Sequence, residues 1–214
     1  MTSTPDSTAR MCGFCGYDLS GLNGQCPECG RPMYRFTDRA RQALVEANAH
    51  AIRLLRGEDP EQRKPRWWLA RQWDSKAIEP HHVLLGIISG PPGVGQHALR
   101  TCGTDLNRLR QGIIEGLPRC IPATVADGVR LPLSRSGHRL VSAAIEESFE
   151  LGHSWVGTEH LLLALCTQGD RSLRRSLKEN GVSHAKIRSL VAANMAAIAL
   201  AEKGKHDQTK DIAR

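Results

Sequence analysis

The apolar and polar positions of this chain alternate with a helical period from Phe36 almost to the C-terminus. In the stretch FTDRARQALVEANAHAIRLL, apolar residues recur every three or four positions, at Ala40, Leu44, Ala47, Ala51 and Leu54. Thr37, followed by Asp38, has the residue type that caps the start of a helix. The pattern therefore predicts a long amphipathic helix that begins after Thr37.

The same arrangement returns later in the chain. The stretch LSRSGHRLVSAAIEESFELGH repeats it with Val141 in the place of Leu44, at an offset of 97 residues. EPHHVLLGI aligns with GTEHLLLAL, and ALRTCGTDLNRLR aligns with SLKENGVSHAKIR, at an offset of 78. The first copy thus carries 19 extra residues between about Arg56 and Ala77. An internal repeat with one insertion predicts two half-domains that pack with approximate two-fold symmetry.

Each copy predicts one long helix, two short helices joined by a Gly-containing loop, and a final helix. Gly103 and Gly181 are expected to end the third helix of each copy, and Thr104 and Ser183 to cap the fourth. We expect an all-α fold, a pseudo-two-fold pair of four-helix repeats behind a small N-terminal ribbon. The expected divisions are a disordered tail (1–10), the ribbon (11–33), repeat 1 (36–116, with the insertion at about 57–76), a linker (117–133), repeat 2 (134–201) and a charged tail (202–214).

The N-terminal module reads CGFCGYDLSGLNGQCPECG and contains two CxxCG motifs. A CxxCG turn directs two thiolates at one point, and two such turns supply four soft ligands for a tetrahedral metal site. We expect structural Zn²⁺ bound by Cys12, Cys15, Cys26 and Cys29, with no open coordination position for catalysis. A redox dithiol and a rubredoxin-like iron site are the alternatives for the same spacing.

Composition restricts the class of protein further. The 29 Lys and Arg residues outnumber the 22 Asp and Glu residues, which gives a formal net charge of +7. This excess is compatible with nucleic acid or an acidic partner, and also with an ordinary soluble protein. The polar N-terminus has no apolar core of a secretory signal, and the apolar runs are too short to span a bilayer, so we expect a cytoplasmic protein without a membrane partner.

The stretch GPPGVGQH, from Gly90 to His97, has the glycine spacing of a phosphate-binding P-loop. A P-loop needs a lysine and a Ser or Thr after its glycines, and Gln96 and His97 stand there instead. The preceding VLLGIIS belongs to a repeated helical unit rather than to a buried strand. The glycines are therefore predicted to form a turn between two helices.

From these motifs the chain is similar to a known family. FTDRARQAL, LGHSWVGTEHLLLAL and the paired repeat resemble the double Clp-repeat N-terminal domain of AAA+ unfoldases of the ClpC and ClpA class. The resemblance covers about 36–195 and does not extend to an ATPase domain. It implies an all-helical module that receives substrates and adaptors. The expected partners are therefore components of a Clp-type ATPase or protease, its adaptors, or its substrate proteins.

The resemblance also implies a specific site. In the ClpC class the Thr-Glu of each GTEH motif lies at a helix start and recognises phosphorylated arginine. Thr158 and Glu159 keep this pattern, whereas Pro80 and His81 replace it in the first copy. The alternative is structural, with Thr158 as an N-cap and Glu159 as a favourable acid in the first turn.

The insertion is the most individual segment of the chain. Its core RKPRWWLARQW has four cations, no acid and three of the four tryptophans. Stacking on nucleic-acid bases, anchoring a protein partner and covering the helical domain remain open as roles. The residues we single out for partner binding are Arg66, Trp67, Trp68, Arg71 and Trp73.

No catalytic arrangement is recognisable in the sequence. His82 and His160 occupy matching places on apolar helices, which favours core histidines over metal ligands. His81 and His82 are adjacent and should not share a helix face. We therefore expect a non-enzymatic protein-binding module of Clp-type proteolysis, with a zinc-ribbon regulator that binds nucleic acid as the alternative.

Overall fold

The computed structural model describes residues 28, 35–58, 76–117, 124–126, 128–153 and 155–193. The four ribbon cysteines, the core of the insertion and both tails lie outside the described residues. The first repeat consists of β1 (Arg35–Phe36), α1 (Asp38–Arg56), α2 (Pro80–Ser89), α3 (Val94–Thr101) and α4 (Leu106–Gly116). The second consists of α5 (Arg135–Glu150), β2 (Trp155–Val156), α6 (Thr158–Gln168), α7 (Arg171–Glu179) and a final helix at 184–193.

Local sequence signals account for most of the helix ends. Thr37 caps α1 as predicted, because its hydroxyl accepts the Ala40 N–H at 3.2 Å. Gly103 and Gly181 follow α3 and α7 with φ of 82° and 73°, the left-handed conformation that glycine adopts without strain. Thr104 does not cap α4. Asp105 does so instead, since its carboxylate accepts two backbone N–H groups of the first turn.

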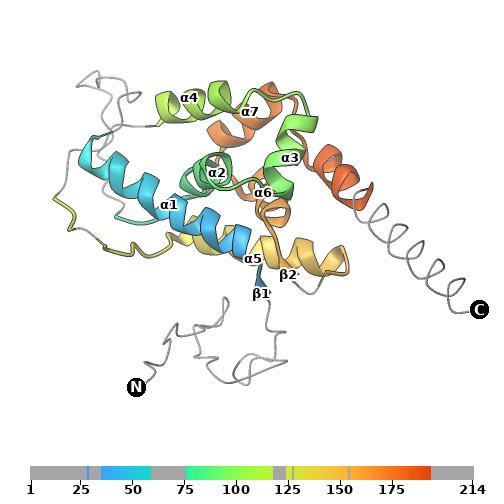
Figure 1. Cartoon of the computed structure of the whole chain (residues 1–214), viewed down its shortest axis with the longest axis horizontal. Coiled ribbons are helices and arrows are strands. Elements are labelled where there is room, and N and C mark those ends of the chain that lie inside the picture. The colour runs from blue at the N-terminus through green and yellow to red at the C-terminus, as the bar shows by residue number, and fades with distance from the viewer. Residues whose placement is uncertain are drawn as a thin grey trace, which may run out of the picture.

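The core lies between the two repeats. Helices α2 and α6 are buried on nearly every side, which is typical of helices at the centre of a domain. Figure 1 shows them in the middle of the molecule, with α4 and α7 on one side and the long helices α1 and α5 on the other. The buried side chains are mainly aliphatic, as the low aromatic content of the chain requires.

Backbone pairing between the repeats demonstrates the predicted two-fold relation. Phe36 of β1 pairs in parallel with Val156 of β2, and an isolated parallel bridge joins Ile78 to Leu133. Leu133 lies 97 residues after Phe36, and Val156 lies 78 residues after Ile78, the two offsets found in the sequence. The residue before the long helix of each repeat therefore pairs with the segment before the second helix of the other.

Within the described residues, no helix is both long enough and apolar enough to cross a membrane.

Candidate functional site

The start of α6 gathers the polar residues that the sequence singles out. Gly157 is the N-cap and Thr158 is the first helical residue, so the prediction of Thr158 as the cap was wrong. The Thr158 hydroxyl instead accepts the Gly95 N–H of α3 at 3.0 Å. A Cβ at Gly95 would lie 2.7 Å from the Thr158 carbonyl oxygen, so only glycine allows this approach. The P-loop-like stretch was predicted to form a turn between two helices; Gly90 and Gly93 do lie between α2 and α3, whereas Gly95 lies inside α3 and serves helix packing.

Glu159 follows Thr158 and is also buried, with 6% of its surface exposed. Burial raises the pKa of its carboxyl group, while hydrogen bonds from its own backbone N–H and from the Thr158 hydroxyl oppose the rise. The carboxylate lies over Gly157, where a side chain would collide with it. Gly95, Thr158 and Glu159 thus form one connected polar contact between the two repeats.

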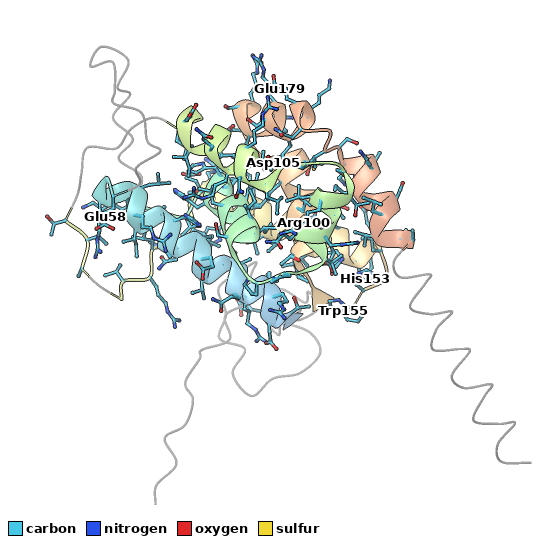
Figure 2. The ribbon with its side chains drawn as sticks, turned by 45° about the horizontal axis from the view of Figure 1, so that its top comes forward. Glu58, Arg100, Asp105, His153, Trp155 and Glu179 are labelled. Atoms are coloured by element: carbon cyan, nitrogen blue, oxygen red, sulfur yellow. The ribbon has the colours of Figure 1, made fainter. Side chains whose placement is uncertain are left out.

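The third residue of the helix, His160, begins a chain of hydrogen bonds. Its Nδ1 accepts the Gly157 N–H at 2.8 Å, so this nitrogen carries no proton. Neutral imidazole must then be protonated at Nε2, which donates to Nδ1 of His153 at 2.8 Å. The His153 ring stacks on the Trp155 ring, with the two ring centroids 5.4 Å apart, and Figure 2 shows these two residues side by side.

The first repeat contains an equivalent arrangement, in which His82 contacts a different histidine. Nδ1 of His82 accepts the Glu79 N–H at 3.0 Å, and its Nε2 lies 3.1 Å from Nε2 of His81. Each histidine therefore holds the place that Glu or Gln takes in a capping box, three residues after the N-cap. The rings of the two adjacent histidines nevertheless contact each other edge to face, with their centroids 4.1 Å apart.

The cluster of His153, Glu159 and His160 has the residue types of a metal centre, with candidate ligand atoms within 4.8 Å of one another. The hydrogen bonds argue against a metal there. Nδ1 of His160 is occupied by a backbone N–H, and its Nε2 carries the proton donated to His153, so no lone pair of His160 is free for a cation. Burial lowers the pKa of His160 to about 4 and that of His82 to about 3, so both rings are neutral near pH 7.

Thiol chemistry finds no support in the part of the chain that the structure describes. The free thiols there, Cys102 and Cys166, are partly buried. Burial raises the pKa of both, that of Cys166 to about 12, so neither is a thiolate at neutral pH. The rings of His153 and His160, and those of His81 and His82, contact one another, whereas Nε2 of the buried His50 lies 3.0 Å from the Ser89 hydroxyl.

The predicted site residues fall into two groups. Thr158 and Glu159 lie together at the repeat junction, whereas the zinc ligands and the Arg/Trp residues of the insertion lie outside the described residues. The hydrogen bond from His160 to His153 was missed by sequence reasoning. Its only signal is the seven-residue spacing within LGHSWVGTEH, which brings the two rings together only after the intervening turn has formed.

The domain consists of two equivalent helical repeats, and a short backbone segment of each repeat pairs with the other repeat. The model of one family, the Clp repeat (R) N-terminal domain, matches residues 68–180. The chain belongs to this family.

Curated relatives agree with the assignment. The chain is 27% identical over 157 residues to the chaperone protein ClpB of Oceanobacillus iheyensis. The aligned region covers 73% of this chain and 17% of ClpB. It is 28% identical over 159 residues to ClpC/MecB of Bacillus subtilis, a negative regulator of genetic competence, covering 73% of this chain and 16% of that protein. An uncharacterised protein of Mycobacterium tuberculosis is 32% identical over 144 residues, 66% of this chain and 48% of that one. The chain thus spans less than half the length of these relatives.

Solved structures show the same fold. The N-terminal domain of the chaperone ClpD from Arabidopsis thaliana matches with a TM-score of 0.51 at 21% identity, covering 75% of this chain and 97% of that one. The Hsp104 N-terminal domain from Candida albicans matches with a TM-score of 0.52 at 18% identity, covering 76% and 91%. At these identities the likeness concerns the fold alone.

Proposed function

We propose that this chain is a non-catalytic protein-binding module of Clp-type proteolysis in the cytoplasm. The observation that carries the proposal is the complete double repeat, in which backbone pairing joins each half to the other. A domain built this way presents helix surfaces and grooves to partners. The buried Thr158 hydroxyl and His160 ring are used for internal hydrogen bonds.

Membership of the family supports a proposal for the partners. The chain binds substrates or adaptors of a Clp-type ATPase, or docks on the ATPase as an accessory subunit. The similarity to ClpB and ClpC, which covers 17% and 16% of those proteins, supports this assignment.

The test uses the purified chain and a purified ClpC-type ATPase from the same organism. Size-exclusion chromatography and fluorescence anisotropy should show a complex, or a ternary complex when an unfolded client is present. Absence of binding both to the ATPase and to unfolded clients would refute the proposed function.

A structural zinc ribbon is part of the proposal. Cys12, Cys15, Cys26 and Cys29 would bind one Zn²⁺ and so fold a segment with almost no apolar core. Elemental analysis of the purified chain should give one zinc per molecule, and Cys26→Ser should release it. Iron in place of zinc, or no metal, would contradict this part.

Phosphoarginine recognition at Thr158 and Glu159 stays a prediction. Both side chains are buried, and the Thr158 hydroxyl already accepts a hydrogen bond from Gly95, which favours the structural role. If a phosphoarginine peptide binds here, calorimetry should show weaker binding to Glu159→Ala. If the variant and the wild-type chain bind the peptide with equal affinity, Thr158 and Glu159 have only a structural role.

A further inference from the structure

Two aromatic side chains are exposed where α5 ends and β2 begins. Phe149 is 68% exposed and Trp155 is 39% exposed. Within the residues that the structure describes, the only other Phe, Tyr or Trp is Phe36, which packs against the core. Large aromatic side chains are buried to a high degree on average in folded proteins, so two exposed ones on the same turn need an explanation.

The backbone and the rings around Trp155 are held by specific contacts. The His153 N–H donates to the Ser148 carbonyl oxygen at 2.8 Å, which closes the turn that follows Phe149. The His153 ring stacks on the Trp155 indole and accepts a hydrogen bond from His160 of α6. The indole therefore rests on a ring that is itself fixed by the core. A side chain held in this way loses little conformational entropy when another surface covers it.

The parallel pairing of β1 and β2 determines which segment lies next to these side chains. Arg35 is in register with Trp155, and Phe36 with Val156. Parallel strands begin at the same end of a sheet, so the chain that precedes β1 emerges beside the chain that precedes β2. The chain before β2 is the turn after Phe149, and the chain before β1 is the N-terminal segment, residues 1–34. Figure 1 shows the two strands together at the edge of the helical domain.

The register also determines which way Trp155 faces. Successive side chains of a strand point to opposite faces of the sheet. Val156 is buried and Phe36 packs against the core, so Trp155 lies on the face directed away from the core. Figure 2 shows Trp155 at the edge of the domain. The exposed indole is thus accessible on the side of the strand pair from which the N-terminal segment leaves.

The predicted ribbon (11–33) cannot lie far from this surface. Its last residue, Met33, comes two residues before Arg35, which an extended chain spans in at most about 7 Å. Paired strands lie about 5 Å apart, so the end of the ribbon is within about 12 Å of the Trp155 backbone. A tether this short gives the ribbon an effective concentration of the order of millimolar at the exposed aromatics. This favours the ribbon over a separate chain as the occupant.

The ribbon has a composition that suits such a contact. It contains two aromatic residues, Phe14 and Tyr17, and two leucines, Leu19 and Leu22. A segment of this length has too few apolar residues to bury these side chains in a core of its own. Packing against Phe149 and Trp155 would remove apolar surface of both partners from water.

We propose that the ribbon packs back on Phe149 and Trp155, which together form its docking surface on the helical domain. The contact goes beyond the proposed function, because it concerns how the ribbon is attached to the repeats and requires neither a Clp partner nor a bound metal. The ribbon and the two repeats then move as one body, with the ribbon beside the turn between α5 and β2.

Hydrogen–deuterium exchange of the full-length chain, followed by mass spectrometry, tests this contact. Amides of residues 11–33 should exchange about tenfold faster in Trp155→Ala and in Phe149→Ala than in the wild-type chain, because each substitution removes an aromatic anchor and increases the undocked fraction. Val45→Ala is the matched control, since Val45 is 59% exposed on α1 and is not part of the docking surface. This variant should leave the exchange of the ribbon unchanged.

Each other outcome overturns the docking surface. Equal exchange of residues 11–33 in the wild-type chain and both aromatic variants would show that the ribbon does not dock there. An effect of Trp155→Ala alone would be explained by loosening of the β1–β2 pair, because Phe149 lies outside that pair. Equal acceleration in Val45→Ala would show general destabilisation.

Concentration separates the ribbon from a second copy of the chain. Protection of residues 149–155 should be the same at high and low protein concentration, because the contact is intramolecular. Protection that falls on dilution would place a second copy on the surface and overturn the proposal. The binding assay with the Clp-type ATPase is independent of these measurements, so failure of the docking surface and failure of the proposed function are distinguishable.

Discussion

The stability of this domain should fall on mild acidification, because its repeat junctions contain neutral buried histidines. The pKa of His160 is lowered to about 4 and that of His82 to about 3, from an ordinary value of 6.5. Burial is the main cause in both, and a neighbouring histidine adds to it. As the pH falls below about 6.5, the unfolded chain binds these protons before the folded chain does. The stabilising contribution is therefore complete above that pH and is lost as the pH falls.

The size of the loss follows from the shifts. Each pH unit below 6.5 costs about 1.4 kcal/mol per histidine until the folded-state pKa is reached. At pH 5 this amounts to about 2 kcal/mol for each ring and about 4 kcal/mol for the two. Since domains of this size are stable by roughly 5–15 kcal/mol, the loss is a large share of the total. Urea unfolding followed by circular dichroism at pH 7, 6 and 5 measures it.

The variant His160→Gln separates this effect from the titration of other groups. Its carboxamide can accept the Gly157 N–H and donate to His153, as His160 does, but it does not titrate. The fall in unfolding free energy between pH 7 and pH 5 should be smaller by about 2 kcal/mol than in the wild type. Groups common to both proteins cancel in this difference. An identical pH dependence of the two proteins would refute the assignment of His160 as a neutral, fully bonded ring.

Three further predictions concern individual contacts. Gly95→Ala should destabilise the fold by about 1–3 kcal/mol, because its Cβ would lie 2.7 Å from the Thr158 carbonyl oxygen; thermal unfolding measures this. Thr158→Val should cost about 1–3 kcal/mol, because the buried Gly95 N–H loses its acceptor, whereas Thr158→Ser should restore most of that stability in the same assay. Cys166 should react with iodoacetamide at pH 8 far more slowly in the folded chain than in urea, as followed by peptide mass mapping; equal rates would contradict its raised pKa.

Much of the fold was predictable because the same pattern of helices occurs twice in the sequence. The offsets of 97 and 78 residues aligned the helices, and they also relate the two backbone pairings that join the repeats. Thr37 and Gly181 have local roles that follow from residue type, and the structure confirms both.

The site was less predictable because its contacts are non-local. The Thr158 hydroxyl binds a backbone N–H 63 residues earlier, so its residue type alone suggested a cap that Gly157 actually provides. The Thr104 hydroxyl likewise donates to the Asn180 carbonyl oxygen instead of capping α4.

The exchanged backbone pairing has a consequence for how the domain can be divided. Phe36 and Leu133 each lie just before the long helix of one repeat, and the residues that follow them bond to the other repeat: the Thr37 N–H donates to the Val156 carbonyl oxygen, and the Ser134 N–H donates to the Ile78 carbonyl oxygen. The molecule is thus an internal counterpart of a domain-swapped dimer, joined by a covalent connection. Two fragments cut within 118–123 should each remain unfolded alone and recover the helical signal on mixing. An ancestral single repeat would, on the same grounds, have needed a second copy of itself to fold.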